Sequence, residues 1–129
     1  MNRKLIYKSK EKSTSFSICS YNILAQGLHD KNKKKKSKNL EKIESWPNRW
    51  KMLKQEFIKL NSDIYCLVEV ENNVYNNELK TFFYLNNNKN FNGVYTPREY
   101  YSSETKPMNQ IVGNAIFYNT DRFRIIQTR

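Results

Sequence analysis

The chain has 129 residues, of which 38% are hydrophobic and 14% are aromatic, so it can form no more than one modest domain. Lys and Arg number 23 against 12 for Asp and Glu, and the formal net charge of +11 favours an anionic partner such as nucleic acid without choosing among anions. The two cysteines lie in apolar stretches without a regular spacing, which argues against a secreted disulfide scaffold.

The first residues are basic but lack the apolar run of a signal peptide, and no stretch is long enough to span a bilayer. We therefore expect a basic extension at residues 1–15 and a folded region at 16–129, in a soluble protein of the cytoplasm or the nucleus. Residues 31–38 (KNKKKKSK) carry dense like charge without periodicity, which predicts an exposed, poorly ordered loop. The loop either serves RNA binding or nuclear import, or is a surface insertion without a role.

Apolar patterning predicts a strand, a helix and a second strand in the first half of the chain. Residues 16–24 (FSICSYNIL) are rich in aromatic and branched side chains, which is typical of a core strand. Large apolar residues recur every three or four positions over Trp46–Leu60, with Pro47 in the first turn, and this predicts an amphipathic helix. Residues 63–70 (DIYCLVEV) resemble a buried strand, so the order predicts a β-α-β unit.

The second half of the chain predicts one more helix and several short strands. Residues 74–85 carry apolar side chains at helical spacing. The Asn-Gly pair at residues 92–93 is expected to form a turn before a strand at 94–96. Residues 111–118 and 123–127 flank a polar four-residue segment and are expected to pair as a hairpin.

Two polar residues, Asn22 and Glu69, lie at the carboxyl ends of the two strands in the predicted β-α-β unit. Ligands and catalytic groups gather at this edge of α/β sheets, so the two side chains can converge. A carboxylate beside an amide suits Mg²⁺, with Glu69 holding the ion and Asn22 orienting a phosphate oxygen or a metal-bound water. On the residues alone, an ordinary turn former or helix cap remains the alternative for each.

Six segments resemble, in order, the opening motifs of one nuclease family. They are SYNILAQ at 20–26, WPNRW at 46–50, DIYCLVEV at 63–70, GVYTPR at 93–98, GNAIFYN at 113–119 and RFRIIQ at 122–127. The family is the deadenylase-like branch (nocturnin/Angel-like) of the exonuclease/endonuclease/phosphatase superfamily. The resemblance implies an α/β fold, a partial αββα sandwich of two sheets flanked by helices, of which this chain holds the N-terminal half. It matches Asn22 to the family's active-site asparagine and Glu69 to its Mg²⁺-binding glutamate.

By the same resemblance, the complete domain would hydrolyse RNA with Mg²⁺ as a 3′-5′ exoribonuclease that shortens poly(A) 3′ ends, with partners in a deadenylation complex and none in a membrane. The family's remaining catalytic asparagine and aspartates and its closing histidine have no counterpart in this sequence. The chain alone is therefore expected to be inactive. The alternative is a catalytically silent module that binds RNA or protein.

The sequence also departs from the family's pattern. Val68 replaces the glutamine expected before the metal-binding glutamate, which removes a supporting side chain, and Val112 replaces an aspartate before the later glycine, which bears on substrate preference. His29 follows the first motif directly, so it is expected to be a loop residue without function rather than the family's histidine. Cys19, Cys66 and His29 lack the ligand spacing of a zinc site.

Overall fold

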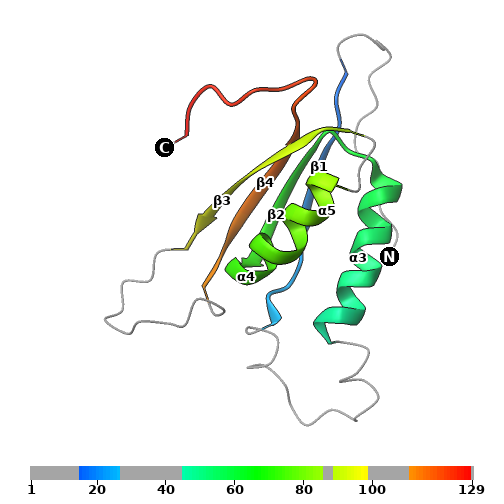
Figure 1. Ribbon diagram of the computed structural model, residues 1–129, viewed down its shortest axis with the longest axis vertical. Helices are drawn as coiled ribbons and strands as arrows, with labels where there is room; N and C mark the ends of the chain where they lie inside the picture. Colours follow the sequence, from blue (N-terminus) through cyan, green and yellow to red (C-terminus); the bar gives the residue numbers. More distant parts are fainter. Residues whose placement is uncertain (1–14, 27–44, 86–88, 99–110, 129) are drawn as a thin grey trace.

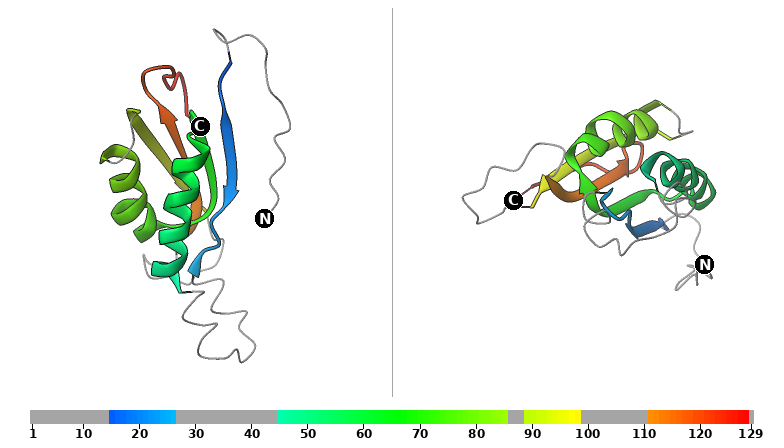
Figure 2. Two further views of the ribbon diagram at one scale, coloured as in Figure 1. Left: turned by 90° about the vertical axis from the view of Figure 1, so that its right-hand side faces the viewer. Right: turned by 90° about the horizontal axis from the view of Figure 1, so that it is seen from below.

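The computed structural model describes residues 15–26, 45–85, 89–98 and 111–128. They form one four-stranded sheet with helices packed on one face (Figures 1 and 2). The α/β class predicted from the sequence is therefore confirmed. His29, the lysine-rich segment at 31–38 and residues 1–14 of the predicted basic extension lie outside the described residues.

The strands of the sheet lie in the spatial order β1-β2-β4-β3. Their bounds are Ile18–Asn22 for β1, Ile64–Glu71 for β2, Phe91–Pro97 for β3 and Val112–Asn119 for β4. Strands β1 and β2 run parallel, whereas β4 is antiparallel to both β2 and β3. Because a helix connects β1 to β2, the predicted β-α-β unit is present, and the carboxyl ends of both strands meet at one edge of the sheet.

The connecting helix, α3, spans Trp46–Leu60 as predicted. Pro47 occupies the first turn, where the N–H that proline lacks would have no helical partner. Asn61 ends the helix in the left-handed conformation, with φ at 42°, and its N–H bonds to the Phe57 carbonyl. Leu53 and Phe57 are buried, so the predicted apolar face is the one that packs on the sheet.

A second helical segment follows β2 and has three parts. These are α4 at Asn72–Val74, a π-helical turn η1 at Tyr75–Leu79 and α5 at Lys80–Leu85. The helix predicted at residues 74–85 is confirmed, although helical structure begins two residues earlier. None of the helices in the described ranges is both long and apolar enough to cross a bilayer.

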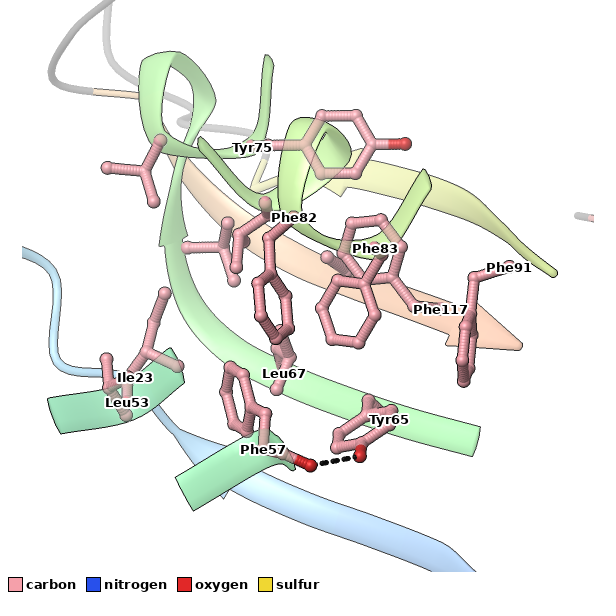
Figure 3. Packing of buried hydrophobic residues seen from close by; sticks show 14 of the residues in the cluster. Ile23, Leu53, Phe57, Tyr65, Leu67, Tyr75, Phe82, Phe83, Phe91 and Phe117 are labelled. Atoms are coloured by element: carbon pink, nitrogen blue, oxygen red, sulfur yellow. Dashed lines mark hydrogen bonds between the residues drawn. The ribbon is translucent and has the colours of Figure 1, made fainter. Parts of the chain in front are cut away.

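Aromatic rings fill the space between the helices and the sheet (Figure 3). The Phe83 ring of α5 stacks on Phe117 of β4 with centroids 4.2 Å apart, and Phe57 of α3 meets Tyr65 of β2 edge to face. The Tyr65 hydroxyl donates to the Phe57 carbonyl over 2.7 Å, so the polar end of this buried ring is satisfied. These rings fix both helical segments on the same face of the sheet.

The turn predicted at residues 92–93 is wrong, because both residues lie inside β3. Gly93 pairs with Phe117 of β4, and a Cβ at this glycine would lie 2.5 Å from a Phe117 ring carbon. The glycine is needed for the close approach of that ring and not for a reversal of the chain. Local turn signals cannot distinguish these two uses of glycine.

The hairpin predicted between residues 111–118 and 123–127 is also wrong. The first segment forms β4, but residues 123–127 form no strand. Both edges of β4 are already paired, one with β2 and the other with β3. A following segment therefore has no free edge of β4 to join.

The face of the sheet away from the helices carries apolar side chains without a covering layer among the described residues. Strand register places Ile18, Val68 and Ile116 on this face, where Ile18 is 58% and Ile116 is 47% exposed. A sheet normally buries such a face against a second layer. The single sheet of the described residues, with one face open, is consistent with the partial sandwich that the sequence predicted.

Asp63, just before β2, is a buried charge that joins four segments. Its Oδ2 accepts hydrogen bonds from the Ser17 N–H at 3.0 Å and from Arg122 Nη1 at 2.9 Å, and its Oδ1 lies 3.3 Å from Lys89 Nζ. Burial by itself raises the pKa of the Asp63 carboxyl, but the Ser17 N–H and the Lys89 charge outweigh it and hold the pKa below its ordinary value. The ionised carboxylate therefore fixes the entry into β1 and β2.

Candidate active site at the carboxyl edge of β1 and β2

The structure brings Asn22 and Glu69 into direct contact. Asn22 is the last residue of β1, and Glu69 lies near the end of β2. The Asn22 Nδ2 atom donates a hydrogen bond to Glu69 Oε1 over 2.8 Å. The two residues that the sequence predicted to converge therefore share one edge of the sheet. Their roles in binding or catalysis stay a prediction.

An irregularity in β2 turns Glu69 toward Asn22. Asn22 pairs with Val68, so in a regular strand the next residue would point to the opposite face of the sheet. The register between β2 and β4 shifts between Leu67 and Val70, and Glu69 adopts the left-handed conformation with φ at 57°. Such bulges often redirect a side chain next to an active site. The sequence gives no local signal of this one.

A turn directly after β1 fixes the other end of the Asn22 amide. Asn22 Oδ1 accepts the Leu24 N–H over 2.8 Å, and Leu24 also has a left-handed backbone, with φ at 57°. The Ile23 N–H bonds to the Val68 carbonyl over 3.1 Å, which ties the turn to β2 beside Glu69. Because both ends of the amide are bonded, Asn22 presents one defined orientation to the carboxylate.

The second carboxylate oxygen of Glu69 is the atom that fits a metal ion. Glu69 Oε2 is buried and has no hydrogen-bond partner among the described residues. A buried carboxylate oxygen without a donor is costly unless a cation or water fills the position. No group of three His, Cys, Asp or Glu side chains in the described ranges could hold a metal. Among the described residues Glu69 would thus offer its carboxylate to an ion that keeps several waters, as Mg²⁺ does.

The residues that depart from the family's pattern do not support the site. The Val68 side chain is exposed on the open face of the sheet and cannot supply the hydrogen bond that a glutamine would. Val112 is buried and pairs with Glu71, on the side of β2 opposite to β1 and Asn22. Cys19 is buried on the helix side of the sheet, whereas Cys66 lies on the open side. The two sulfurs therefore cannot belong to one metal site.

Sequence reasoning missed Arg49 as a neighbour of the site. Its guanidinium donates a hydrogen bond to the Leu24 carbonyl in the turn after β1. The one signal in the sequence is the position of Arg49 in the WPNRW segment. A helical residue 25 positions from its partner gives no contact information without the fold.

Comparisons with known proteins place the chain by its fold. No protein-family model and no curated protein matches it. A solved structure of ANGEL2, "a 2′,3′-cyclic phosphatase", in complex with adenosine-2′,3′-vanadate matches with a TM-score of 0.66 and 23% identity, covering 87% of this chain and 29% of ANGEL2. A second ANGEL2 structure gives a TM-score of 0.64.

The human Nocturnin catalytic domain with a bound sulfate anion also matches, with a TM-score of 0.60 and 21% identity. The match covers 87% of this chain and 35% of the Nocturnin chain. These likenesses confirm the predicted resemblance to the nocturnin/Angel-like fold. The chain spans about a third of the length of these solved domains.

Proposed function

We propose that the chain carries the metal- and phosphate-binding edge of a magnesium-dependent RNA phosphodiesterase, which in the complete domain removes nucleotides from 3′ ends such as poly(A). One observation carries this proposal: Asn22 donates to one oxygen of Glu69, while the other oxygen is buried and has no hydrogen-bond partner among the described residues. The ligands named for two neighbours add support. ANGEL2 holds adenosine-2′,3′-vanadate and Nocturnin holds sulfate, and both ligands resemble a phosphate group.

The Asn22 amide has two tasks in this proposal. An asparagine amide carries two N–H donors, and one of them holds Glu69 Oε1. The second is left to donate to a phosphate oxygen of the substrate. Glu69, held in this orientation, would hold the ion through Oε2. Bound Mg²⁺ would polarise the phosphoryl oxygen and activate a water for in-line attack.

RNA is the proposed substrate because the chain combines this edge with a strong positive charge. A formal charge of +11 attracts any polyanion, and neutralising RNA phosphates makes such binding fall with salt. Charge alone does not select a 3′ end. The selection is assigned to Asn22 and Glu69, which would engage the terminal phosphodiester through the metal.

Cleavage needs more than these two side chains. A phosphodiesterase also has to activate the water, stabilise charge at phosphorus and protonate the leaving oxygen. The described residues place one carboxylate and one amide at the edge. We therefore propose that the chain binds the metal and RNA but does not cleave by itself, and that the missing groups come from further polypeptide.

The proposal is tested by the binding of fluorescent oligo(A) RNA to the chain, with Mg²⁺ and with a chelator present, for the wild type and for Glu69→Gln. We expect Mg²⁺ to tighten binding of the wild type but not of Glu69→Gln, and both proteins to lose affinity as salt rises. The alternative function, a silent RNA-binding module, predicts equal affinities in all four conditions. That result would contradict the proposed role of the site.

A further inference from the structure

Arg49 of α3 forms hydrogen bonds with the turn that follows β1. Its Nη1 atom donates to the Leu24 carbonyl over 2.8 Å, and Nη2 donates to the same carbonyl and, over 3.3 Å, to that of Ile23. Two consecutive carbonyls are thereby held by one planar group. A guanidinium presents its donors in a rigid fork, which suits this arrangement.

The packing of α3 in turn holds Arg49. The guanidinium carbon lies 5.2 Å from the centre of the Trp46 ring, one turn earlier on the helix. Trp46 stacks on Trp50, and Trp50 packs edge to face on Phe82 of α5. The guanidinium is therefore positioned by a row of rings that leads into the core.

The turn that Arg49 binds, at Ile23 and Leu24, also orients Asn22. Leu24 donates its N–H to Asn22 Oδ1 and keeps a left-handed backbone that a leucine adopts only at a cost. Its carbonyl is the main acceptor of Arg49. A change in the Leu24 backbone would move the N–H away from Asn22, and the Asn22 amide would then lose one of its two anchors.

We infer that Arg49 is a positioning residue for the Asn22–Glu69 site: it holds Leu24 in its left-handed conformation, so that Asn22 stays aligned on the carboxylate of Glu69. The inference rests on the proposed function for its importance in metal binding, but its geometric part stands without a metal. A left-handed backbone costs leucine more than it would cost glycine, so hydrogen bonds from another segment are needed to hold Leu24 in it.

The metal-free test uses the intact chain with Arg49→Ala and Arg49→Lys. Lys54→Ala is the matched control. Lys54 is a cation on the same helix, and its Nζ atom lies 5.6 Å from the centre of the Trp50 ring, whereas Arg49 lies over Trp46. NMR spectroscopy follows the side-chain N–H₂ signals of Asn22 and the hydrogen exchange of the Leu24 amide. Urea unfolding measures global stability separately.

We expect Arg49→Ala to speed exchange at Leu24 and to bring the two Asn22 side-chain proton signals toward the values of a solvated amide. Arg49→Lys should be intermediate, since an ammonium cannot hold two carbonyls in a fork. Lys54→Ala should match the wild type. A folded Arg49 variant with wild-type Asn22 signals would overturn the inference, whatever its stability. If Arg49→Ala does not fold, the lysine variant decides.

A second arm measures Mn²⁺ affinity by paramagnetic broadening. Loss of a group that orients a metal ligand typically weakens binding about tenfold or more, and this is the loss expected for Arg49→Ala. Unchanged Mn²⁺ affinity in that variant would contradict the inference. If the wild type itself shows no broadening that depends on Glu69, the proposed function fails, and the metal-free signals alone decide the role of Arg49.

Discussion

Asn22 and Glu69 lie 47 residues apart in the sequence, yet the Nδ2 atom of one is 2.8 Å from the Oε1 atom of the other. Parallel pairing of β1 with β2 brings their backbones together, and the left-handed conformation of Glu69 turns the carboxylate toward the amide. The hydrogen bond therefore depends on both the sheet and the bulge. A substitution of either Asn22 or Glu69 should remove this hydrogen bond and thereby change the stability of the chain.

Asn22→Asp places a second carboxylate against Glu69. Two like charges at this distance repel, and the pKa of one of the carboxyl groups should rise. We expect the free energy of unfolding near neutral pH to fall by about 1 kcal/mol without a metal, as a hydrogen bond is lost. Mg²⁺ should restore stability to Asn22→Asp more than to Asn22→Ala. Urea unfolding with and without Mg²⁺ measures this, and equal Mg²⁺ effects in the two variants would argue against an ion at this position.

Gly93→Ala should destabilise the sheet. The new methyl group would lie 2.5 Å and 2.7 Å from two ring carbons of Phe117, a fully buried residue stacked on Phe83. Overpacking of this kind costs about 1–3 kcal/mol. The control is Thr96→Ala, on an exposed position of the same strand, which should change stability by less than about 0.5 kcal/mol. Thermal or urea unfolding of both variants checks the difference.

The charge on Asp63 makes stability depend on pH. The pKa of Asp63 is lowered in the folded chain, so its contribution is fully present above the ordinary value of 3.8 and is lost as the pH falls through the lower folded value. Asp63→Asn should therefore cost about 2 kcal/mol near neutral pH, from the bonds to Ser17, Lys89 and Arg122. The cost should shrink in acid. A difference between the two proteins that stays constant into acid would show that the charge is not responsible.

The chain alone is expected to leave 5′-labelled poly(A) RNA intact in the presence of Mg²⁺, because one carboxylate and one amide cannot supply all the groups of a phosphodiesterase. Gel electrophoresis of the RNA over time is the measurement, with Glu69→Ala as the control. Stepwise shortening that disappears in the control would mean that the chain assembles a working site without further polypeptide.

The sequence specified the elements well where local chemistry decides them. Helix α3 has its predicted bounds because Pro47 is favourable in a first helical turn and Asn61 readily adopts the left-handed conformation that ends the helix. The contact between Asn22 and Glu69 followed from their places at the ends of adjacent strands. These features depend on a few neighbouring residues and on the rules of a β-α-β unit.

Features that depend on distant partners were not predicted. The sequence predicts a turn at Gly93, because the ring of Phe117 that requires a glycine there lies in another strand. The bulge at Glu69 arises from the register between β2 and β4. The hydrogen bonds from Arg49 to Leu24 join a helix to a turn that lies far from it in the sequence. No periodicity or local composition encodes these relationships, so they appear only once the sheet is assembled.

An NMR titration of the labelled chain with Mg²⁺ tests whether Glu69 holds a metal ion beside Asn22. We predict saturable shifts at the Asn22 side-chain amide and at the Leu24 and Glu69 backbone amides, and their loss in Glu69→Gln. Asp121→Asn is the matched control. Asp121 accepts a hydrogen bond from Asn90 just after the end of β4, and that end of β4 pairs with the start of β2, opposite to Glu69. This variant should respond to Mg²⁺ as the wild type does. Shifts that persist in Glu69→Gln, or that centre on other residues, would show that the ion does not bind at Glu69.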